Sequence, residues 1–595
     1  MKLSPLTALV LLTGCMHPAP GQAPAPLNAD AVAGVADPRL RQLLSDEWEN
    51  AMIETPTTAT GLGDHRYDDR MDVHSQAAIT ASQHARDGFL ARADAIPAAS
   101  LNALDATTLE LFTETLRDGQ GTDVCHTDQW GLSARNNALT MVAAMGDLQP
   151  IVTTQDATNY VARLRGLPVY ITDDMDNLRL GIAQKRTPNA ASVRLVIQQI
   201  DAVLATPIAE WATAEPLKTP HPDWGPGVEG RFHTDVLEFA TIALVPALTG
   251  YRAFLNDELL PVARGDDRVG IWALPDGDAC YKALILSHTS LPLDAADLHA
   301  TGLSELEGIH AEMQVLGQKL FGTSDLPTLF AKLRTDPTLR FSTADEILAK
   351  ANANLAAAKA RIPAFFGHLP KADCEVRPIP GYEAPYTTIA YYKQLVPGEQ
   401  PGYYYVNTYQ PETRPRFEAS ALAFHESIPG HHLQIAIARE LPEMPAFRRN
   451  LEITAFEEGW ALYTERLADE MGLYATDLDR LGMLSFDSWR ASRLVVDTGI
   501  HAMHWDRAQA EKFMMESTPL AENNIHNEVD RYITWPGQAL AYKTGQMTIR
   551  DLRREAEAKM GPAFSLPAFH DVVLGGGAVT LPLLQERVRA WENGK

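Results

Sequence analysis

The chain is organised around residues 423–434, which read Ala423-Phe424-His425-Glu426-Ser427-Ile428-Pro429-Gly430-His431-His432-Leu433-Gln434. A His followed at once by a Glu begins the HExxH motif. In that motif two His residues four positions apart share one helix face and hold Zn²⁺, while the Glu activates water. Here Pro429 stands four residues after His425, and the next histidines are His431 and His432. The stretch therefore predicts a metal site with an altered geometry.

A straight helix cannot bring His425 and His431 to one metal, because six residues advance about 9 Å along the helix axis. Pro429 prevents a straight helix, since it offers no N–H to the carbonyl of His425 and its ring clashes with the preceding turn. Gly430 permits an unusual backbone angle. We expect a bulge that returns His431 to the metal-facing position. His432 is the rival ligand, although it requires more distortion.

Composition describes an ordinary globular protein of 595 residues, with 45% hydrophobic and 21% charged residues. The net charge of −25 argues against nucleic acid and anionic membrane surfaces as partners. After the amino-terminal segment we find no apolar run long enough to span a bilayer. Membrane contact is therefore expected only through the amino terminus, and the sequence identifies no protein partner.

The amino terminus has the features of an export signal. Met1-Lys2 is a short basic start, and an apolar run leads to Leu12-Thr13-Gly14-Cys15. This ending resembles a bacterial lipobox, which implies a signal peptide over 1–15 and a lipidated Cys15; the alternative is a coincidental Cys. Residues 16–36, rich in Pro and Ala, are predicted to be a flexible tether. Met16, in place of Asp, favours the outer over the inner membrane.

Residues 37–595 are predicted to form a single catalytic domain that is mainly α-helical. Amphipathic periodicity dominates the helical half, 37–372. The half covering 373–595 carries the motif and three short aromatic, β-branched runs (376–380, 386–392 and 403–407). These runs predict a small antiparallel β-sheet just before the motif helix. The sheet either holds an extended substrate at its edge or is a structural flap.

Three cysteines remain beyond the signal: Cys125, Cys280 and Cys374. They form no CxxC pair and no metal-type cluster. In an exported protein two of them can form a disulfide, but the sequence does not say which two, and three buried thiols remain an alternative.

A stripe of polar residues on one later helix is a second candidate site. Arg490, Arg493, Asp497 and His501 are spaced by three, four and four residues and lie among apolar neighbours. The stripe therefore faces a polar interior or cleft. Arg490 or Arg493 can bind a peptide carboxylate, and His501 can hydrogen-bond the substrate or the tetrahedral intermediate. The alternative is a buried structural salt bridge between Arg493 and Asp497.

The motif and a later segment together resemble one bacterial family. The run His425-Glu426-x-x-Pro429-Gly430-His431-His432-Leu433-Gln434, followed by residues 458–463 (Glu-Gly-Trp-Ala-Leu-Tyr), is similar to the family called domain of unknown function 885. The similarity runs from about Asp37 to the end. That family resembles the helical zinc peptidases, which include Taq carboxypeptidase, angiotensin-converting enzyme and oligopeptidase F. The resemblance implies a large helical domain with a deep cleft.

The same resemblance implies roles for individual residues. Several of those peptidases have Gly directly before the second zinc His, which favours His431. Their third ligand lies on a following helix, a spacing that Glu458 fits, with Glu457 as a neighbouring surface acid. A tyrosine late in such chains often supports the oxyanion. Tyr542 is the candidate and Tyr532 is the next choice, here as a substrate-binding residue; both can instead be core aromatics.

The sequence thus predicts an envelope zinc metallopeptidase that cleaves small peptides. One Zn²⁺ is expected on His425, His431 and Glu458, with Glu426 as the general base and with His501 and Tyr542 supporting the oxyanion. One alternative is a zinc amidase or another hydrolase that acts on a non-peptide substrate. The other is a non-catalytic, metal-binding envelope lipoprotein.

Overall fold

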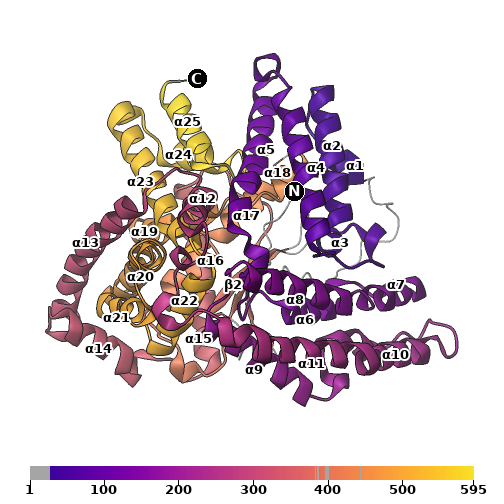
Figure 1. Cartoon of the computed structure of the whole chain (residues 1–595). Coiled ribbons are helices and arrows are strands. Elements are labelled where there is room, and N and C mark those ends of the chain that lie inside the picture. Colours follow the sequence, from indigo (N-terminus) through magenta and orange to yellow (C-terminus); the bar gives the residue numbers. More distant parts are fainter. Residues whose placement is uncertain (1–26, 382–383, 385–387, 395–400, 442–443, 595) are drawn as a thin grey trace. The chain divides into compact units, whose positions relative to one another are not determined.

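The computed structural model describes residues 27–381, 384, 388–394, 401–441 and 444–594 (Figure 1). The predicted signal peptide, Cys15 and the first part of the tether lie outside these residues. Helix α1 (Leu27–Ala31) falls within the predicted tether, and its Ala31 is buried, as is Val35 beyond it. The prediction of a mainly helical fold is confirmed.

The chain divides into two compact units. Unit 1 comprises residues 1–280 together with 445–447, and unit 2 comprises 281–444 together with 448–595. The division therefore falls after Cys280, whereas the sequence placed the boundary between the two halves at residue 372. The reason is that helices α13 and α15 pack against α20 and α16 of unit 2.

Unit 1 is built from helices that begin at side-chain caps, for example at Asp37, Ser75 and Asn102. Its elements are α1, α2 (Pro38–Glu54), α3 (Pro56–Gly61), α4 (Gln76–Asp94), α5 (Ala103–Thr122), α6 (Ala138–Leu148), α7 (Thr154–Leu164), α8 (Leu167–Ala183), α9 (Ala190–Ala205), α10 (Val228–Phe239), α11 (Val245–Phe254) and the start of α12 (Gly277–Thr289). Helices α6 to α11 share one apolar core.

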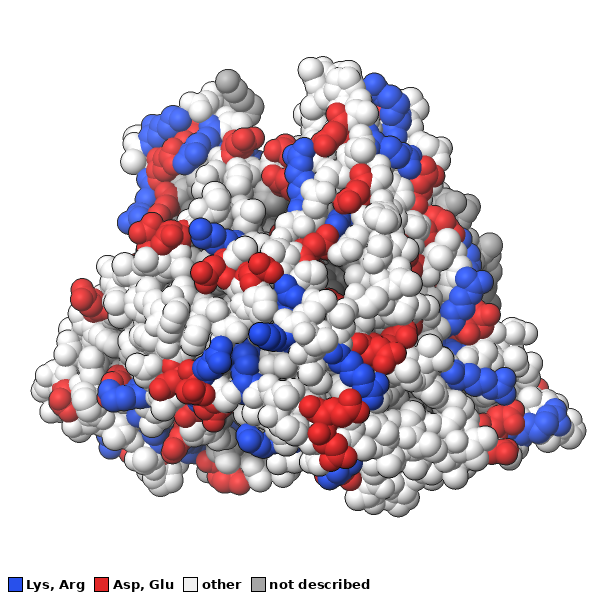
Figure 2. Space-filling view, viewed as in Figure 1, with Lys and Arg blue, Asp and Glu red and all other residues white. Residues whose placement is uncertain are grey.

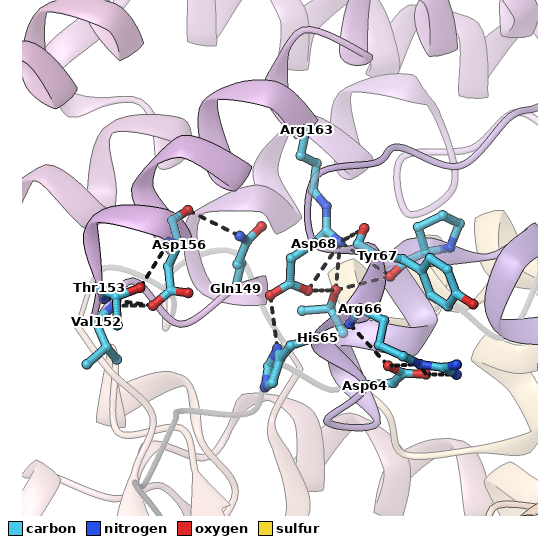
Figure 3. A network of polar contacts seen from close by, with 12 residues as sticks. Asp64, His65, Arg66, Tyr67, Asp68, Gln149, Val152, Thr153, Asp156 and Arg163 are labelled. Atoms are coloured by element: carbon cyan, nitrogen blue, oxygen red, sulfur yellow. Dashed lines mark hydrogen bonds and ion pairs between the residues drawn. The ribbon is translucent and has the colours of Figure 1, made fainter. Parts of the chain in front are cut away.

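A buried arginine joins the start of unit 1 to α7. Figure 3 shows Arg163 pointing into the turn that carries Tyr67 and Asp68. Its Nη2 donates to Thr60 Oγ1 at 2.7 Å and to the Tyr67 carbonyl at 2.9 Å, and its Nε donates to the Arg70 carbonyl at 2.8 Å. These acceptors bind Nε and Nη2 of a fully buried guanidinium, so the network is structural.

Unit 1 also contains the disulfide that the sequence left open. Cys125 is bonded to Cys280, and Cys374 of unit 2 is a free, buried cysteine. The bond closes a loop over a sequence separation of 155 residues.

One helical stretch of unit 1, Val228–Val262, is long and apolar enough to cross a membrane by length and composition. The sequence analysis found no such run. Phe232, Val236 and Leu248 bury one side of this stretch in the core of unit 1. A single stretch of this kind is weak evidence for a membrane span, because core helices and signal sequences pass the same test.

Unit 2 contains a small sheet and the remaining helices. They are α13 (Ala295–Phe321), α14 (Leu326–Thr335), α15 (Ala344–Arg361), β1 (Cys374–Pro378), β2 (Ala390–Gln394), β3 (Gly402–Val406), α16 (Ala419–Glu426), α17 (His431–Glu440), α18 (Ala446–Arg449, shared with unit 1), α19 (Thr454–Glu470), α20 (Asp477–His501), α21 (Arg507–Ser517), α22 (Glu522–Thr534), α23 (Ala541–Met560), α24 (Leu566–Leu574) and α25 (Leu581–Glu592).

Helix α20 is the centre of unit 2. Every residue from Leu481 to His501 is buried, and α13, α16, α19, α22 and α23 pack around it (Figure 1). Helices α19 and α23 approach closely because glycines face each other. A Cβ on Gly459 would lie 2.4 Å from Gly545 Cα, and a Cβ on Gly545 would lie 1.8 Å from the Ala455 carbonyl oxygen. This contact fixes the helix that carries Glu458.

The sheet is mixed, so the prediction of an antiparallel sheet is wrong. The strand order is β1-β3-β2, with β2 antiparallel and β1 parallel to the central β3. The chain crosses from β1 to the far edge before it returns, which places the last strand in the middle and parallel to the first. Part of the predicted second strand, residues 386 and 387, lies outside the described residues. Strands β2 and β3 contact α17, so the sheet does lie beside the motif.

Charged side chains of both signs are interspersed over the face shown in Figure 2. Exposed pairs such as Arg179 with Glu258 illustrate the pattern. On this face the acidic charge is not gathered into one area.

Candidate metal centre

The motif helix is broken in two. Helix α16 ends at Glu426 and α17 begins at His431, and the Ile428–Pro429 peptide bond between them is cis. The expected bulge in a continuous helix is therefore wrong. The four-residue connection nevertheless places the rings of His425 and His431 with centroids 4.8 Å apart. The break therefore brings His425 and His431 close together, which a straight helix would not do.

Gly430 is required at the break because of close packing. A Cβ at this position would lie 1.9 Å from the His425 carbonyl oxygen and 2.5 Å from the Phe424 carbonyl oxygen. Its φ of −78° is one that other residues also adopt, whereas its ψ of −129° is unusual. Glycine is therefore required at position 430 because there is no room for a side chain, and not because the backbone is left-handed.

Helix α19 holds the broken segment in place. Trp460 Nε1 donates to the Pro429 carbonyl at 3.0 Å, and Thr464 Oγ1 donates to the Phe424 carbonyl at 3.4 Å. The indole is fully buried. The segment around Glu458 and Trp460 thus has two functions. Glu458 is a candidate ligand, and Trp460 holds the connection between α16 and α17.

His425, His431 and Glu458 form one compact group. Glu458 Oε2 lies 3.6 Å from His425 Nε2 and 3.5 Å from His431 Nε2. The potential ligand atoms of the three residues all lie within 4.8 Å of one another. Glu458 Oε2 is buried and has no hydrogen-bond partner among the described residues. A buried, unbonded carboxylate oxygen that faces two imidazole nitrogens fits a cation between them.

The electrostatics of the group also favour a cation. Burial disfavours the charged imidazole, yet the nearby carboxylates of Glu458 and Glu465 raise the pKa of His425 to about 9. Burial likewise opposes the ionised Glu458, yet the two imidazoles hold the pKa of this carboxyl well below its usual range. The protein thus attracts positive charge to this point, and a metal ion would take the place of the protons.

A second carboxylate orients the first histidine. His425 Nδ1 donates to Glu465 Oε1 at 2.8 Å, and Glu465 is fully buried on α19. This contact leaves His425 Nε2 facing Glu458. Metal-binding histidines commonly donate their other N–H to a carboxylate in this way, which fixes the tautomer and increases ligand basicity. The sequence analysis gave Glu465 no role, although it lies seven residues after Glu458 and hence on the same helix face.

His432 is turned toward the sheet instead of the metal group. Its Nδ1 is hydrogen-bonded to the Tyr392 hydroxyl of β2 at 3.0 Å. Burial lowers the pKa of His432 to about 4, so the ring is neutral at pH 7. The geometry therefore favours His431 over His432 as the second ligand.

Glu426 lies at the end of α16, next to the first candidate ligand. Its carboxylate lies near the Tyr404 phenol on β3. Burial and this carboxylate both raise the pKa of the phenol. Within the described residues, no hydrogen bond occupies the Glu426 carboxylate. It is half-buried, so it is available to exchange a proton with a bound molecule.

Arg493 and Tyr532 form a structural network. Arg493 Nε and Trp489 Nε1 both donate to the Tyr532 hydroxyl at 3.0 Å, and Arg493 Nη2 donates to Glu528 Oε2 at 2.9 Å. The predicted alternative was a salt bridge between Arg493 and Asp497; the partner is instead Glu528 of α22. Tyr532 is fully buried, and its hydroxyl accepts both of these hydrogen bonds.

His501 and Asp497 lie at the far end of the predicted stripe. His501 Nε2 is hydrogen-bonded to the Tyr532 carbonyl at 2.9 Å, while Asp497 accepts from the Tyr281 hydroxyl at 2.6 Å. Eleven residues separate His501 from Arg490, or about 16 Å along the helix axis. Because Arg490 is the member of the stripe that faces Glu465, His501 does not belong to the same site.

The Tyr542 hydroxyl has a hydrogen that it can still donate. This hydroxyl accepts from Arg531 Nη2 at 3.2 Å, and the Arg493 guanidinium lies over the Tyr542 ring at 4.3 Å. Because the hydroxyl oxygen acts as an acceptor there, its own O–H remains available to donate elsewhere.

Comparisons with known proteins identify the family of the chain. The sequence pattern of the family described as "Bacterial protein of unknown function (DUF885)" matches residues 56–588. The chain is a DUF885 protein. A comparison with curated proteins gives no match for it.

Two solved structures are similar to this DUF885 protein. One is described as "the putative lipoprotein from Colwellia psychrerythraea" and has a TM-score of 0.87 at 26% identity, covering 94% of this chain and 100% of that chain. The other is described as "a putative lipoprotein of unknown function from Shewanella oneidensis" and has a TM-score of 0.74 at 18% identity, covering 92% and 99%. The second supports the fold alone.

Proposed function

We propose that this DUF885 protein is a zinc-dependent hydrolase that cleaves peptide bonds of small peptides in the cell envelope. The observation that carries the proposal is the unbonded Glu458 Oε2, which is buried between the Nε2 atoms of His425 and His431 at 3.6 and 3.5 Å. Two imidazoles and one carboxylate are a typical ligand set of catalytic zinc, which leaves a fourth position open.

Two of the three ligand separations are close to those of a zinc site, and the third is at most 4.8 Å. Zinc binds imidazole nitrogen and carboxylate oxygen at about 2.0–2.2 Å, so two ligands of a tetrahedral site lie ~3.3 Å apart. The separations of 3.5 and 3.6 Å from Glu458 are close to this value. Imidazole nitrogen suits zinc better than it suits calcium or magnesium, which prefer oxygen ligands.

Glu426 performs the proton transfers in this mechanism. A zinc ion held by His425, His431 and Glu458 would acidify a water molecule and polarise the peptide carbonyl. Glu426 accepts the proton of that water as its oxygen attacks the carbonyl carbon, and donates it to the amine nitrogen as the C–N bond breaks. Tyr542, which keeps its O–H, supports the negative charge that develops on the carbonyl oxygen. Glu465 holds His425 in the required tautomer.

The amino terminus and one similar structure support the proposed location. The lipobox-like end at Cys15 implies a lipid anchor, and the similar structure from Colwellia psychrerythraea is described as that of a lipoprotein. Met16 after the cysteine favours the outer membrane.

The variant Glu426→Gln tests the mechanism. It should retain about one zinc per chain, because Glu426 is not a ligand, and it should lower kcat for peptide hydrolysis by at least about 10³-fold. Zinc analysis and hydrolysis of a peptide library, run beside non-peptide amides and esters, measure both properties. The exposed Glu412→Gln serves as the matched control and should behave as wild type. Unchanged peptide hydrolysis in Glu426→Gln would reject the mechanism.

A further inference from the structure

Arg490 is a buried arginine without a hydrogen bond. Its side chain on α20 is 5% exposed, and its Nε and Nη1 are buried atoms that find no partner among the described residues. The rings of Phe486 and Trp489 lie 4.5 and 4.2 Å from its guanidinium carbon. The aromatic rings thus hold the guanidinium in place and leave its donors unused.

The neighbouring arginines are committed elsewhere. Arg493 donates to Tyr532 and Glu528, and Arg531 donates to Gln538 at 2.6 Å and to Tyr542. Each of these two arginines keeps one buried nitrogen without a partner, Arg493 Nη1 and Arg531 Nε, whereas Arg490 makes no hydrogen bond within the described part of the cluster.

The nearby carboxylates do not satisfy Arg490. Its Nη2 lies 3.7 Å from Glu465 Oε1, and that oxygen already accepts a hydrogen bond from His425. The Glu418 carboxylate accepts from Ser485 Oγ at 2.7 Å. A buried charge with unmade hydrogen bonds costs several kcal/mol, so a bound group is expected to complete the site.

We propose that Arg490 binds the carboxyl-terminal carboxylate of the peptide substrate, so that the enzyme removes residues from the carboxyl end. This inference rests on the proposed function. A carboxylate matches a guanidinium in charge and planar shape, whereas the interior of a longer peptide offers no charge at this point.

The distance to the metal group sets the length of the released piece. Arg490 is linked to His425 only through Glu465, by contacts of 3.7 and 2.8 Å. A peptide advances about 3.6 Å per residue. A carboxylate on Arg490 therefore places the scissile bond one or two residues from the carboxyl terminus.

Paired substrates test the inference in the zinc-loaded full chain. Short peptides with a free carboxyl terminus and the same peptides as carboxyl-terminal amides are compared. Wild type should prefer the free acid by about 100-fold or more in kcat/KM, and Arg490→Gln should abolish this preference by losing activity on the acid alone. Arg490→Lys, which keeps the charge but not the fork, should retain part of the preference. Arg480→Gln on the same helix, whose exposed side chain pairs with Asp469, is the matched control.

A binding measurement separates this inference from the proposed function. Isothermal titration calorimetry measures the binding of an N-acetyl amino acid, and separately of its amide, to the protein without turnover. If wild type cleaves no peptide, the proposed function fails, but loss of carboxylate binding in Arg490→Gln would still support the site. Two results would overturn the inference. One is equal cleavage of acid and amide by wild type, and the other is equal binding of the carboxylate by wild type and Arg490→Gln with unchanged zinc content. Either result would leave Arg490 with a water molecule only.

Discussion

At the scale of single residues, the site depends on which atoms are left unbonded. Glu458 Oε2 faces two imidazoles without a hydrogen bond, whereas Glu465 Oε1 is bonded to His425 Nδ1. The two carboxylates come from one helix but have different tasks: one would bind the metal and the other orients its ligand. A carboxylate that orients a metal-binding histidine contributes to affinity without touching the metal.

Replacing Glu465 by Gln should therefore weaken zinc binding about 10- to 100-fold. The amide oxygen can still accept from His425 Nδ1, but the negative charge that strengthens the imidazole as a ligand is lost. Competition with a zinc chelator measures the dissociation constant. Glu470→Gln, an exposed position on the same helix that pairs with Arg553, is the control and should leave the constant unchanged. Equal affinity in both variants would remove Glu465 from the metal centre.

At the scale of secondary structure, the break between α16 and α17 makes the site. Pro429 and Gly430 end one helix and begin another, and Trp460 of α19 holds the Pro429 carbonyl. Close packing of Gly459 against Gly545 then fixes α19 itself. The position of Glu458 thus depends on glycines and an indole that never touch the metal.

Gly430→Ala should disrupt this arrangement. Its Cβ would lie 1.9 Å from the His425 carbonyl oxygen, so the connection must open and move His431 away. We expect a loss of at least about 3 kcal/mol in the free energy of unfolding, together with at least tenfold weaker zinc binding. Urea unfolding and chelator competition measure the two effects.

The control for this variant is Gly308→Ala on α13, where a Cβ meets nothing within 4 Å. Alanine in an exposed helix interior should stabilise the protein by up to about 1 kcal/mol. If Gly430→Ala behaves like Gly308→Ala, the packing argument for the break is wrong.

The sequence predicted those parts of the site that depend on local chemistry. The His-Glu pair identified His425, the resemblance to the helical zinc peptidases favoured His431 and supplied Glu458, and Pro429 indicated an interruption of the helix. The form of the interruption was not predictable, because the carbonyls that exclude a side chain at Gly430 approach it only in the folded chain. The prediction of an antiparallel sheet failed for the same reason, because β1 and β3 become adjacent only through long-range pairing.

The polar stripe shows the limit of helical periodicity. Spacing correctly placed Arg490, Arg493, Asp497 and His501 on one face of α20 and inside the protein. It did not indicate that this face extends over about 16 Å, so that its two ends serve different neighbours. Tyr532 and His501 consequently belong to structural contacts.

At the scale of the whole molecule, the chain consists of two compact units, and one disulfide lies wholly in the first. The pairing of Cys125 with Cys280 could not be deduced, because three cysteines allow three pairs. The free cysteine, Cys374, is buried, and burial raises its pKa to about 12, which makes it a poor nucleophile.

Thiol labelling of the chain from Leu27 onward should therefore give a defined pattern. The folded protein should react negligibly, the unfolded protein should react at one cysteine, and the reduced, unfolded protein should react at three. Replacing Cys125 and Cys280 by Ser should lower the free energy of unfolding by about 3 to 5 kcal/mol, because the bond closes a long loop. Labelling of Cys125 or Cys280 without reduction would contradict the pairing.

The central claim is that the broken helix builds a zinc site from His425, His431 and Glu458. The most direct measurement is the zinc content of the purified protein by mass spectrometry, in wild type and in the adjacent variants His431→Gln and His432→Gln. We expect about one zinc per chain in wild type and in His432→Gln, and almost none in His431→Gln. Wild type without stoichiometric zinc, or zinc lost from His432→Gln and kept in His431→Gln, would contradict the claim.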